Sequence, residues 1–357
     1  MKIIYSFNKT GFEEAYWTRE IAGASGDGHQ FIPFNHGRFA DPSRYLRAQL
    51  LDNLYFAQDP SLMRLYAELS RLIGETGADV LLVDNCFPYH PEFLRSLDIY
   101  KVLRTTDGPM TAYDRDFAYV HAYDHVLYHS PAYSRDLTMA EKLAYCGARR
   151  ADFWPLCAFD ALCDRTKTEA NILSHRRDID VVFVGALHLN KMPMLARVKR
   201  ALGKKLELRG LASWKKNLYF NAVYGAPGWV RPLPFEGYVP LYQRAKIGIN
   251  VHNRGDYTVG GYRLFDLPAN GVMQISDGGV FLDAFFKPGV EIESYKDADE
   301  LIDKVRFYLA HDDERQRIAL NGFKRVQSEY MARDALRRAA ALAEDGRRGL
   351  QRLDRVR

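Results

Sequence analysis

The sequence predicts an α/β protein with two parallel β-sheets, one in each half of the chain. Short apolar runs alternate with amphipathic helical patterns, as βαβ units require. The run 78–84 is almost continuously apolar, as expected of a strand buried on both faces of a parallel sheet. The same alternation starts again at 180–185. A chain of 357 residues also exceeds the usual size of one hydrophobic core, so we expect two domains.

The first half contains the elements of one doubly wound sheet. The helical stretch 61–73 places Leu62, Leu65, Leu69 and Leu72 on one face, which indicates a helix that packs on the sheet. Predicted strands cover 2–7, 30–34, 78–84, 101–104 and 125–128, and predicted helices include 13–22 and 61–73.

The second half repeats this rhythm and ends in helices. Predicted strands cover 180–185, 205–209, 247–250, 272–275 and 290–292, and predicted helices include 194–202 and 298–311. From residue 312 the pattern is helical almost to residue 345, with an interruption expected near Asn321 and Gly322 and a last helix over 333–343.

Composition changes along the chain suggest the domain boundaries. The polar, charged stretch 166–177 lies between two apolar strand signals, so we interpret it as the linker. The expected parts are a first domain over 1–165, the linker 166–177, a second domain over 178–328, a helix over 329–345 and a basic tail over 346–357.

Charge is concentrated at the C-terminal end. The chain has 50 basic and 45 acidic residues, and its last twelve residues contain five arginines and one aspartate. The other 345 residues therefore carry a net charge of +1, which does not favour nucleic acid as a partner. The Arg-rich tail suits peripheral contact with an anionic membrane, although a free end explains it equally well.

No segment indicates export or a membrane span. No window approaches the roughly 18 consecutive apolar residues that cross a bilayer, and the first residues lack a signal-peptide pattern. The four cysteines form no CxxC pair, as in a reducing compartment. We expect a cytoplasmic protein, with membrane association through the tail as the open alternative.

Ligands of open parallel sheets bind beyond the carboxyl ends of the strands, so the residues that follow each strand are the candidates for function. These segments are 8–11, 84–85, 105–108, 129–130, 185–191, 250–254 and 277–279.

Three candidates fall in the first half. Lys9, Thr10 and Gly11 form the first strand–helix turn, where an acceptor or a phosphate can approach, and a plain turn is the alternative. Asp107 follows a strand and is a candidate general base, although an Asp before Gly-Pro also forms turns. His129 ends another strand and is a candidate to line the cleft.

No metal site is expected. Asp-x-Asp occurs at 114–116, 178–180 and 297–299, a frequency that chance explains. His121, His125 and His129 have the spacing of ligands on a helix, but a strand over 124–128 would scatter them, and we expect His121 and His125 to be solvated or to cap helices.

The densest candidate site is in the second half, around 247–272. A buried strand ending at Asn250 leads into a polar loop, and a helix then begins with Arg263 and Asp266 one turn apart. Arg263 could hold a phosphate while Asp266 accepts ribose hydroxyl groups; a surface Arg–Asp pair is the alternative.

The segment 263–277 resembles the donor-site helix of the two-domain GT-B glycosyltransferases, in the branch of glycosyl transferases group 1 that includes the CgeB-like proteins. The runs 286–291, 297–301, 308–315 and 319–322 are similar to the rest of that module in order and spacing. The resemblance covers about 178–340. It implies two Rossmann-like domains that face each other across a cleft, with a C-terminal helix that crosses back to the first domain.

The resemblance also implies a set of donor-binding residues. Asp266 stands where the family has an acidic residue that binds the donor ribose, whereas the family's other glutamate is replaced by Thr258. The turn at Gly185 faces the donor diphosphate, with His188 and Lys191 supplying charge. The complete predicted nucleotide-sugar site is Gly185, His188, Lys191, Asn250, Tyr262, Arg263 and Asp266.

The expected function is therefore that of a glycosyltransferase. It would move a sugar from a nucleotide sugar to an unidentified acceptor, either a glycan, a lipid-linked glycan or a small molecule, without a metal or another cofactor. Three alternatives stay open: a phage-type DNA base glycosyltransferase, a nucleotide-sugar epimerase, and an inactive nucleotide-sugar-binding protein.

Overall fold

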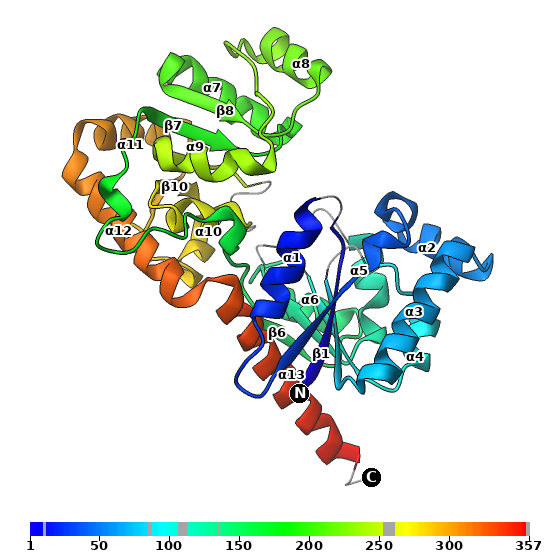
Figure 1. The fold of residues 1–357 in the computed structure, drawn as a ribbon. Helices are drawn as coiled ribbons and strands as arrows, with labels where there is room; N and C mark the ends of the chain where they lie inside the picture. The colour runs from blue at the N-terminus through cyan, green and yellow to red at the C-terminus, as the bar shows by residue number, and fades with distance from the viewer. Residues whose placement is uncertain (10–11, 85–86, 106–112, 135, 253–260, 355–357) are drawn as a thin grey trace. The chain divides into compact units, whose positions relative to one another are not determined.

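The protein consists of two compact units, each of which is an α/β sandwich around a parallel sheet (Figure 1). The computed structural model describes residues 1–9, 12–84, 87–105, 113–134, 136–252 and 261–354. The first unit comprises Met1–Pro155 and Ala332–Arg357, and the second comprises Leu156–Met331. The two-sheet architecture predicted from the strand pattern is confirmed.

The first unit has a six-stranded sheet in the order β2-β1-β3-β4-β5-β6, and all neighbouring strands are parallel. Its strands are β1 (Lys2–Phe7), β2 (Gln30–Asn35), β3 (Val80–Asp84), β4 (Tyr100–Arg104), β5 (His125–Tyr128) and β6 (Ala151–Phe153). Its helices are α1 (Phe12–Gly23), α2 (Ala48–Phe56), α3 (Pro60–Thr76), α4 (Pro91–Ser96), α5 (Tyr113–Tyr119), α6 (Met139–Tyr145) and α13 (Ala332–Asp354).

The C-terminal helix α13 returns to the first unit, as the resemblance implied. The indole N–H of Trp154 donates to the carbonyl of Ala335 at 2.8 Å, and Arg347 pairs with Asp79 at 2.9 Å. Gly346 has no room for a side chain because the hydroxyl of Tyr100 lies against it. The helix continues to Asp354, so most of the residues expected to form a tail are helical.

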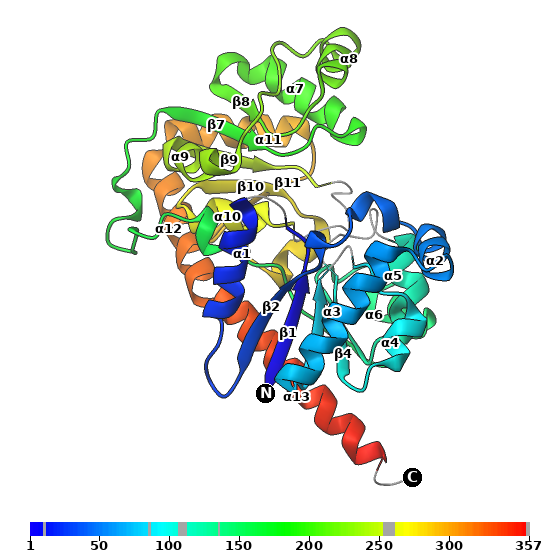
Figure 2. The same cartoon turned by 45° about the vertical axis from the view of Figure 1, so that its right-hand side comes forward.

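The second unit has a five-stranded parallel sheet in the order β11-β10-β9-β7-β8 (Figure 2). Its strands are β7 (Ile179–Val184), β8 (Leu206–Arg209), β9 (Ala245–Asn250), β10 (Met273–Asp277) and β11 (Glu293–Tyr295). Its helices are α7 (Met192–Leu202), α8 (Trp214–Tyr224), α9 (Tyr238–Arg244), α10 (Arg263–Ala269), α11 (Ala298–Ala310) and α12 (Asp312–Glu329).

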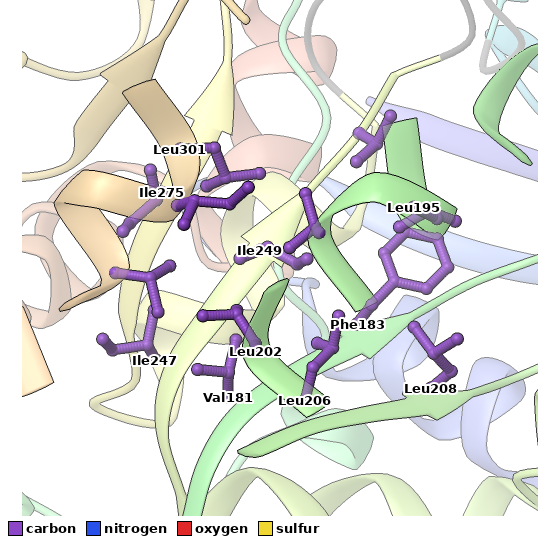
Figure 3. Packing of buried hydrophobic residues seen from close by; sticks show 14 of the residues in the cluster. Val181, Phe183, Leu195, Leu202, Leu206, Leu208, Ile247, Ile249, Ile275 and Leu301 are labelled. Carbon is purple, nitrogen blue, oxygen red and sulfur yellow. The ribbon is translucent and has the colours of Figure 1, made fainter. Parts of the chain in front are cut away.

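Branched and aromatic side chains fill the space between this sheet and its helices. Phe183 of β7 lies beside Leu195 of α7, and Ile249 of β9 belongs to the same buried cluster (Figure 3). Alternate residues of each strand face this side, as the period of two predicts. The core thereby fixes the strand ends at which the candidate residues lie.

The stretch 166–177, expected to be a linker, packs as part of the second unit. Ile172 is fully buried. Arg177 donates to the carbonyls of Tyr242 at 2.8 Å, Ala245 at 2.7 Å and Asn270 at 3.0 Å. These carbonyls lie at the C-terminal ends of α9 and α10, so the positive charge of Arg177 caps two helices and its polarity does not indicate a free connection.

The expected interruption at Asn321 and Gly322 is wrong, because α12 runs unbroken from Asp312 to Glu329. A Cβ at Gly322 would lie 2.6 Å from the carbonyl oxygen of Glu291. The glycine therefore lets the helix approach the neighbouring chain closely and does not end the helix.

We predict that Gly322→Ala destabilises the protein despite the better helix propensity of alanine. The clash with main chain should cost about 1–3 kcal/mol and lower the urea midpoint. The matched control is Gly74→Ala in α3, where a Cβ meets nothing within 4 Å. That control should be neutral or stabilise by up to about 1 kcal/mol. Equal effects of the two changes would contradict this account of Gly322.

Candidate functional site

Three neighbouring strands of the second unit end at one edge of its sheet. β7 pairs with β9, and β9 pairs with β10, all in parallel register. Their carboxyl ends therefore bring the residues that follow β7 close to Asn250 and Asp277. The first turn of α10, with Arg263, reaches the same edge, as the contacts below show.

The guanidinium group of Arg263 lies directly on the turn after β7. A Cβ at Gly185 would stand 2.9 Å from Cζ of Arg263, so only glycine leaves room for this placement. The guanidinium carbon also lies 5.3 Å from the ring centroid of Phe183, and one guanidinium N–H donates to Asn250 Oδ1 at 2.8 Å. The structure thus brings together three predicted residues: Gly185, Asn250 and Arg263.

Asn250 connects Arg263 to a histidine–aspartate pair. Arg263 only donates, so the amide oxygen of Asn250 faces it and the amide nitrogen faces His252 Nε2 at 3.4 Å. His252 Nε2 must then be the acceptor, which places the ring proton on Nδ1. That N–H donates to Asp277 Oδ1 at 2.7 Å, and the main-chain N–H of His252 donates to Asp277 Oδ2 at 2.8 Å.

Lys191 is buried beside this network, near the charges of Arg263 and Asp277. Its residue is only 6% exposed, and its ammonium group has no hydrogen bond or ion pair with any described residue. Burial, together with the nearby charge of Arg263, lowers the pKa of Lys191 to about 7, although Asp277 opposes the shift. A buried amine without a described partner, directly before the first turn of α7, is a ready partner for an anion.

Asp266 is the second buried ionisable group. It is 4% exposed, and its Oδ1 has no hydrogen-bond partner among the described residues. Burial raises the pKa of Asp266 to about 8, and Arg263, one turn earlier on α10, only partly offsets this. In the ligand-free protein the carboxyl group is therefore largely protonated at neutral pH.

The two other predicted donor residues are less deeply placed. His188 is exposed in the turn after β7, and partial desolvation together with Lys191 and Lys216 lowers its pKa. Tyr262 is half-buried and packs on Phe159, with ring centroids 5.5 Å apart. No contact of either residue tests a role in binding, so both roles stay predictions.

The first-half candidates belong to the other unit. Lys9 pairs with Glu13 at 3.3 Å and lies 4.6 Å from the ring centroid of Trp17. It lines a hollow of about 610 Å³ together with Asn8 and Gly37. His129 is buried, and its Nδ1 lies 3.1 Å from the carbonyl oxygen of Thr105. Thr10, Gly11 and Asp107 lie outside the described residues, as does Thr258.

His125 differs from the expectation of a solvated or capping side chain. It is fully buried on β5, and its Nε2 lies 2.8 Å from Asp152 Oδ2. Burial lowers the pKa of His125 to about 4, with Asp152 acting in the opposite direction. Within the described part of the chain, no three His, Cys, Asp or Glu side chains gather in a group that could hold a metal ion.

His252 and Asp277 are the residues that the sequence analysis did not select. Both lie in segments that follow buried strands, and β9 and β10 are neighbours in the sheet. Strand adjacency is therefore the signal that would have paired them. It was missed because the order of strands cannot be deduced from the apolar pattern alone.

Residues 192–342 match a family model described as "Glycosyl transferase-like". This match includes Asn250, Tyr262, Arg263 and Asp266. A comparison with curated protein sequences finds no match.

Solved structures share the fold over nearly the whole chain. A sucrose-phosphate synthase from Thermosynechococcus elongatus is 13% identical, with a TM-score of 0.62, over 97% of this chain and 98% of that one. Anabaena HepE, solved in complex with UDP-glucose, is 14% identical, with a TM-score of 0.63, over 97% and 100%. A glycosyltransferase from Rickettsia africae is 10% identical, with a TM-score of 0.60, over 97% and 98%.

These findings confirm the GT-B fold and the glycosyltransferase resemblance of 263–277. They also bear out the expectation of an enzyme of the glycosyltransferase type. No described helix is both long and apolar enough to cross a membrane.

The raised pKa of Asp266 predicts a pH-dependent stability. An unfolded aspartate titrates near pH 4, whereas Asp266 titrates at about 8 in the folded protein. The native state therefore holds a proton that the unfolded state releases between these values, so stability falls as pH rises through this window.

We predict that the free energy of unfolding of Asp266→Asn, whose side chain cannot ionise, rises relative to that of the wild type. The difference should grow by up to about 1 kcal/mol per pH unit between pH 5 and 8. The difference should level off above pH 8. Urea unfolding of both proteins across this range measures it. A difference independent of pH would show that Asp266 ionises normally in the native state.

Proposed function

We propose that the protein transfers a glycosyl group from a nucleotide sugar to an acceptor, and that the second unit holds the donor nucleotide. The observation that carries this proposal is a pair of buried residues near the charge of Arg263: Lys191, whose ammonium group makes no hydrogen bond or ion pair with a described residue, and Asp266, whose Oδ1 has no described partner. Such groups are costly to bury, so a protein retains them where a ligand completes them.

The cationic side of the site suits a diphosphate. Burial and the charge of Arg263 lower the pKa of Lys191, and an anion between the two cations would relieve their repulsion. Arg263 is held in place by Gly185, Phe183 and Asn250 and is therefore preorganised. These two cations would offset the negative charge of the leaving diphosphate, which is the basis for proposing transfer without a metal.

The carboxyl side suits a ribose. Asp266 would accept a hydrogen bond from a ribose hydroxyl group through Oδ1, the atom without a partner. Aspartate is one methylene shorter than the glutamate usual in the family. The nucleoside would therefore have to lie close to the first turns of α10.

The reaction follows from this placement. The bond between the anomeric carbon and the β-phosphate oxygen breaks, and the acceptor oxygen forms a new bond to that carbon. The electron pair leaves with the diphosphate, where Lys191 and Arg263 face it. The acceptor proton passes to a base, for which Asp107 and His129 remain the candidates. The hollow beside Lys9 is the proposed place of the acceptor.

UDP is the first nucleotide to test. HepE, which shares the fold, has been solved with UDP, with UDP-glucose, and with UDP and glucose. Thermal shift with UDP, GDP, dTDP, CMP and ADP should reveal stabilisation by one nucleoside diphosphate, since a ligand at about 100 Kd adds about 2.7 kcal/mol. The matching nucleotide sugars are then incubated with and without candidate acceptors.

Each result separates the alternatives. Transfer requires an acceptor and releases nucleoside diphosphate, whereas an epimerase converts the donor alone. Binding without either product indicates an inactive binding protein. Absence of stabilisation by every nucleotide, in a folded protein, would contradict the proposed donor site.

We predict that Asp266→Ala weakens UDP binding by about 1–3 kcal/mol, or roughly 5- to 150-fold. The variant should also lose discrimination against UDP that lacks its ribose hydroxyl groups. Calorimetric titration of both nucleotides into both proteins forms a double-mutant cycle that isolates the carboxyl–hydroxyl contact. An unchanged preference for UDP in the variant would contradict the assignment of Asp266 as the residue that binds the ribose.

Lys191→Gln should act on the other end of the nucleotide. We expect this substitution to weaken the binding of UDP at least tenfold. The binding of UMP, which lacks the β-phosphate, should weaken much less. Lys324→Gln is the control, because Lys324 is exposed and pairs with Glu169 at 3.0 Å, away from these contacts. Equal losses for UDP and UMP would indicate that Lys191 does not contact the β-phosphate.

A further inference from the structure

Helix α8 has apolar side chains on both of its faces. Its inner face buries Asn217 and Phe220. Its outer face exposes Trp214 by 62%, Leu218 by 54% and Val223 by 56%. A helix on a protein surface ordinarily turns charged and polar residues outward, so this outer face requires a separate explanation.

The apolar area extends beyond the helix. Leu211, just before α8, is 73% exposed, and Trp229, on the loop after it, is 54% exposed. Asn217 holds that loop in place, because it accepts from the N–H of Val230 at 2.8 Å and donates to the carbonyl of Val230 at 3.3 Å. We define the α8 surface as Leu211, Trp214, Leu218, Tyr219, Val223 and Trp229.

Single exposed apolar residues are common, but six of them within residues 211–229, two of them tryptophans, indicate a docking surface. α8 follows β8, the edge strand of the sheet, and both views show it at the margin of the second unit (Figures 1 and 2). This position leaves the outer face free of other elements of that unit.

Positive charge is concentrated in the part of the chain that contains the α8 surface. Residues 192–235 contain nine basic residues and one acidic residue, a net charge of +8, which leaves the remaining chain at −3. Lys215 and Lys216 lie on α8 itself, and the ammonium group of Lys215 is 5.7 Å from the ring centroid of Trp214. The acidic residue, Glu207, is paired with Arg209 at 2.7 Å.

A basic hollow lies next to the aromatic residues. Its volume is about 260 Å³, and its lining includes the basic residues Lys199, Lys204, Arg209 and Arg231 together with Glu207 and Trp229. Such a hollow can take the phosphate of a lipid headgroup, while Trp229, a half-exposed lining residue, can enter the adjoining apolar layer. Charge and apolar surface are thus combined in one region.

We propose that the α8 surface docks on an anionic lipid bilayer. Trp214, Leu218 and Trp229 would enter the boundary between headgroups and acyl chains, where indole rings are favoured. The flanking lysines would bind headgroup phosphates. A protein partner fits less well, since the cores of protein interfaces are depleted of lysine.

Docking would bring the bilayer close to the candidate donor site. The N–H of Leu187 donates to the carbonyl of Leu211 at 2.9 Å, so the turn that leads to Lys191 is tied to the start of the α8 surface. A donor site beside a membrane suits an acceptor carried by a lipid. This last step rests on the proposed function, whereas the docking itself does not.

Vesicle co-sedimentation without nucleotide tests the docking separately from transfer. The full chain is mixed with phosphatidylcholine vesicles, or with vesicles of equimolar phosphatidylcholine and phosphatidylglycerol. We expect binding to the anionic vesicles only, with weakening in high salt. Trp214→Ser/Leu218→Ser should lower the partition coefficient at least tenfold. Lys215→Gln/Lys216→Gln should lower it about 30-fold.

Two control variants locate the effect. Lys287→Gln/Lys296→Gln removes the same charge at exposed positions elsewhere in the second unit and should reduce binding much less. Arg348→Gln/Arg352→Gln tests the C-terminal end and should leave binding unchanged. All changed side chains are exposed, so thermal unfolding should show that every variant remains folded.

Three results would overturn the proposal. The first is failure of the wild type to bind anionic vesicles. The second is loss of binding in the Arg348/Arg352 variant and not in the α8 variants. The third is retention by single-stranded RNA or by a second copy of the chain, measured by filter binding and light scattering, without vesicle binding.

Discussion

The placement of the Arg263 guanidinium group against Gly185 is the interaction on which the rest of the candidate site depends. The absence of a Cβ at Gly185 creates the space, the ring of Phe183 forms one wall, and Asn250 accepts a hydrogen bond that sets the orientation. Once Arg263 is fixed, its charge lowers the proton affinity of Lys191. The same charge limits the rise in the pKa of Asp266. The chemistry at this edge of the sheet thus depends on the space that a glycine leaves in the turn after β7.

The buried ionisable groups at this edge of the sheet reduce the stability of the folded protein. Lys191 and Asp266 are both more than nine-tenths buried, and neither functional group is completed by a described partner. Nearby groups of the same kind are satisfied: His252 has Asp277, and Arg177 has three carbonyls. The contrast shows that the fold can satisfy buried polar groups in this unit. A nucleoside diphosphate offers an anion for one of the two groups and hydroxyl groups for the other.

The strands and the donor-site helix could be predicted because their signals are local. Apolar runs located most strands of both sheets, although β6 was not predicted and the predicted strand 290–292 ends just before β11. The strand-end rule with the 263–277 resemblance selected Gly185, Lys191, Asn250, Arg263 and Asp266. Long-range contacts were not predictable in this way. Gly322 resembles a helix breaker until Glu291 is placed beside it, and Arg177 resembles a linker residue until three carbonyls converge on it. The surroundings of His125 include α13, which returns from the far end of the chain and packs beside β5.

The most direct test of the central claim is a crystal structure of the protein with the nucleoside diphosphate that stabilises it. The account predicts the β-phosphate within hydrogen-bond distance of Lys191 Nζ and of the Arg263 guanidinium group, and a ribose hydroxyl group on Asp266 Oδ1. A nucleotide bound elsewhere, with Lys191 and Asp266 still lacking partners, would contradict it.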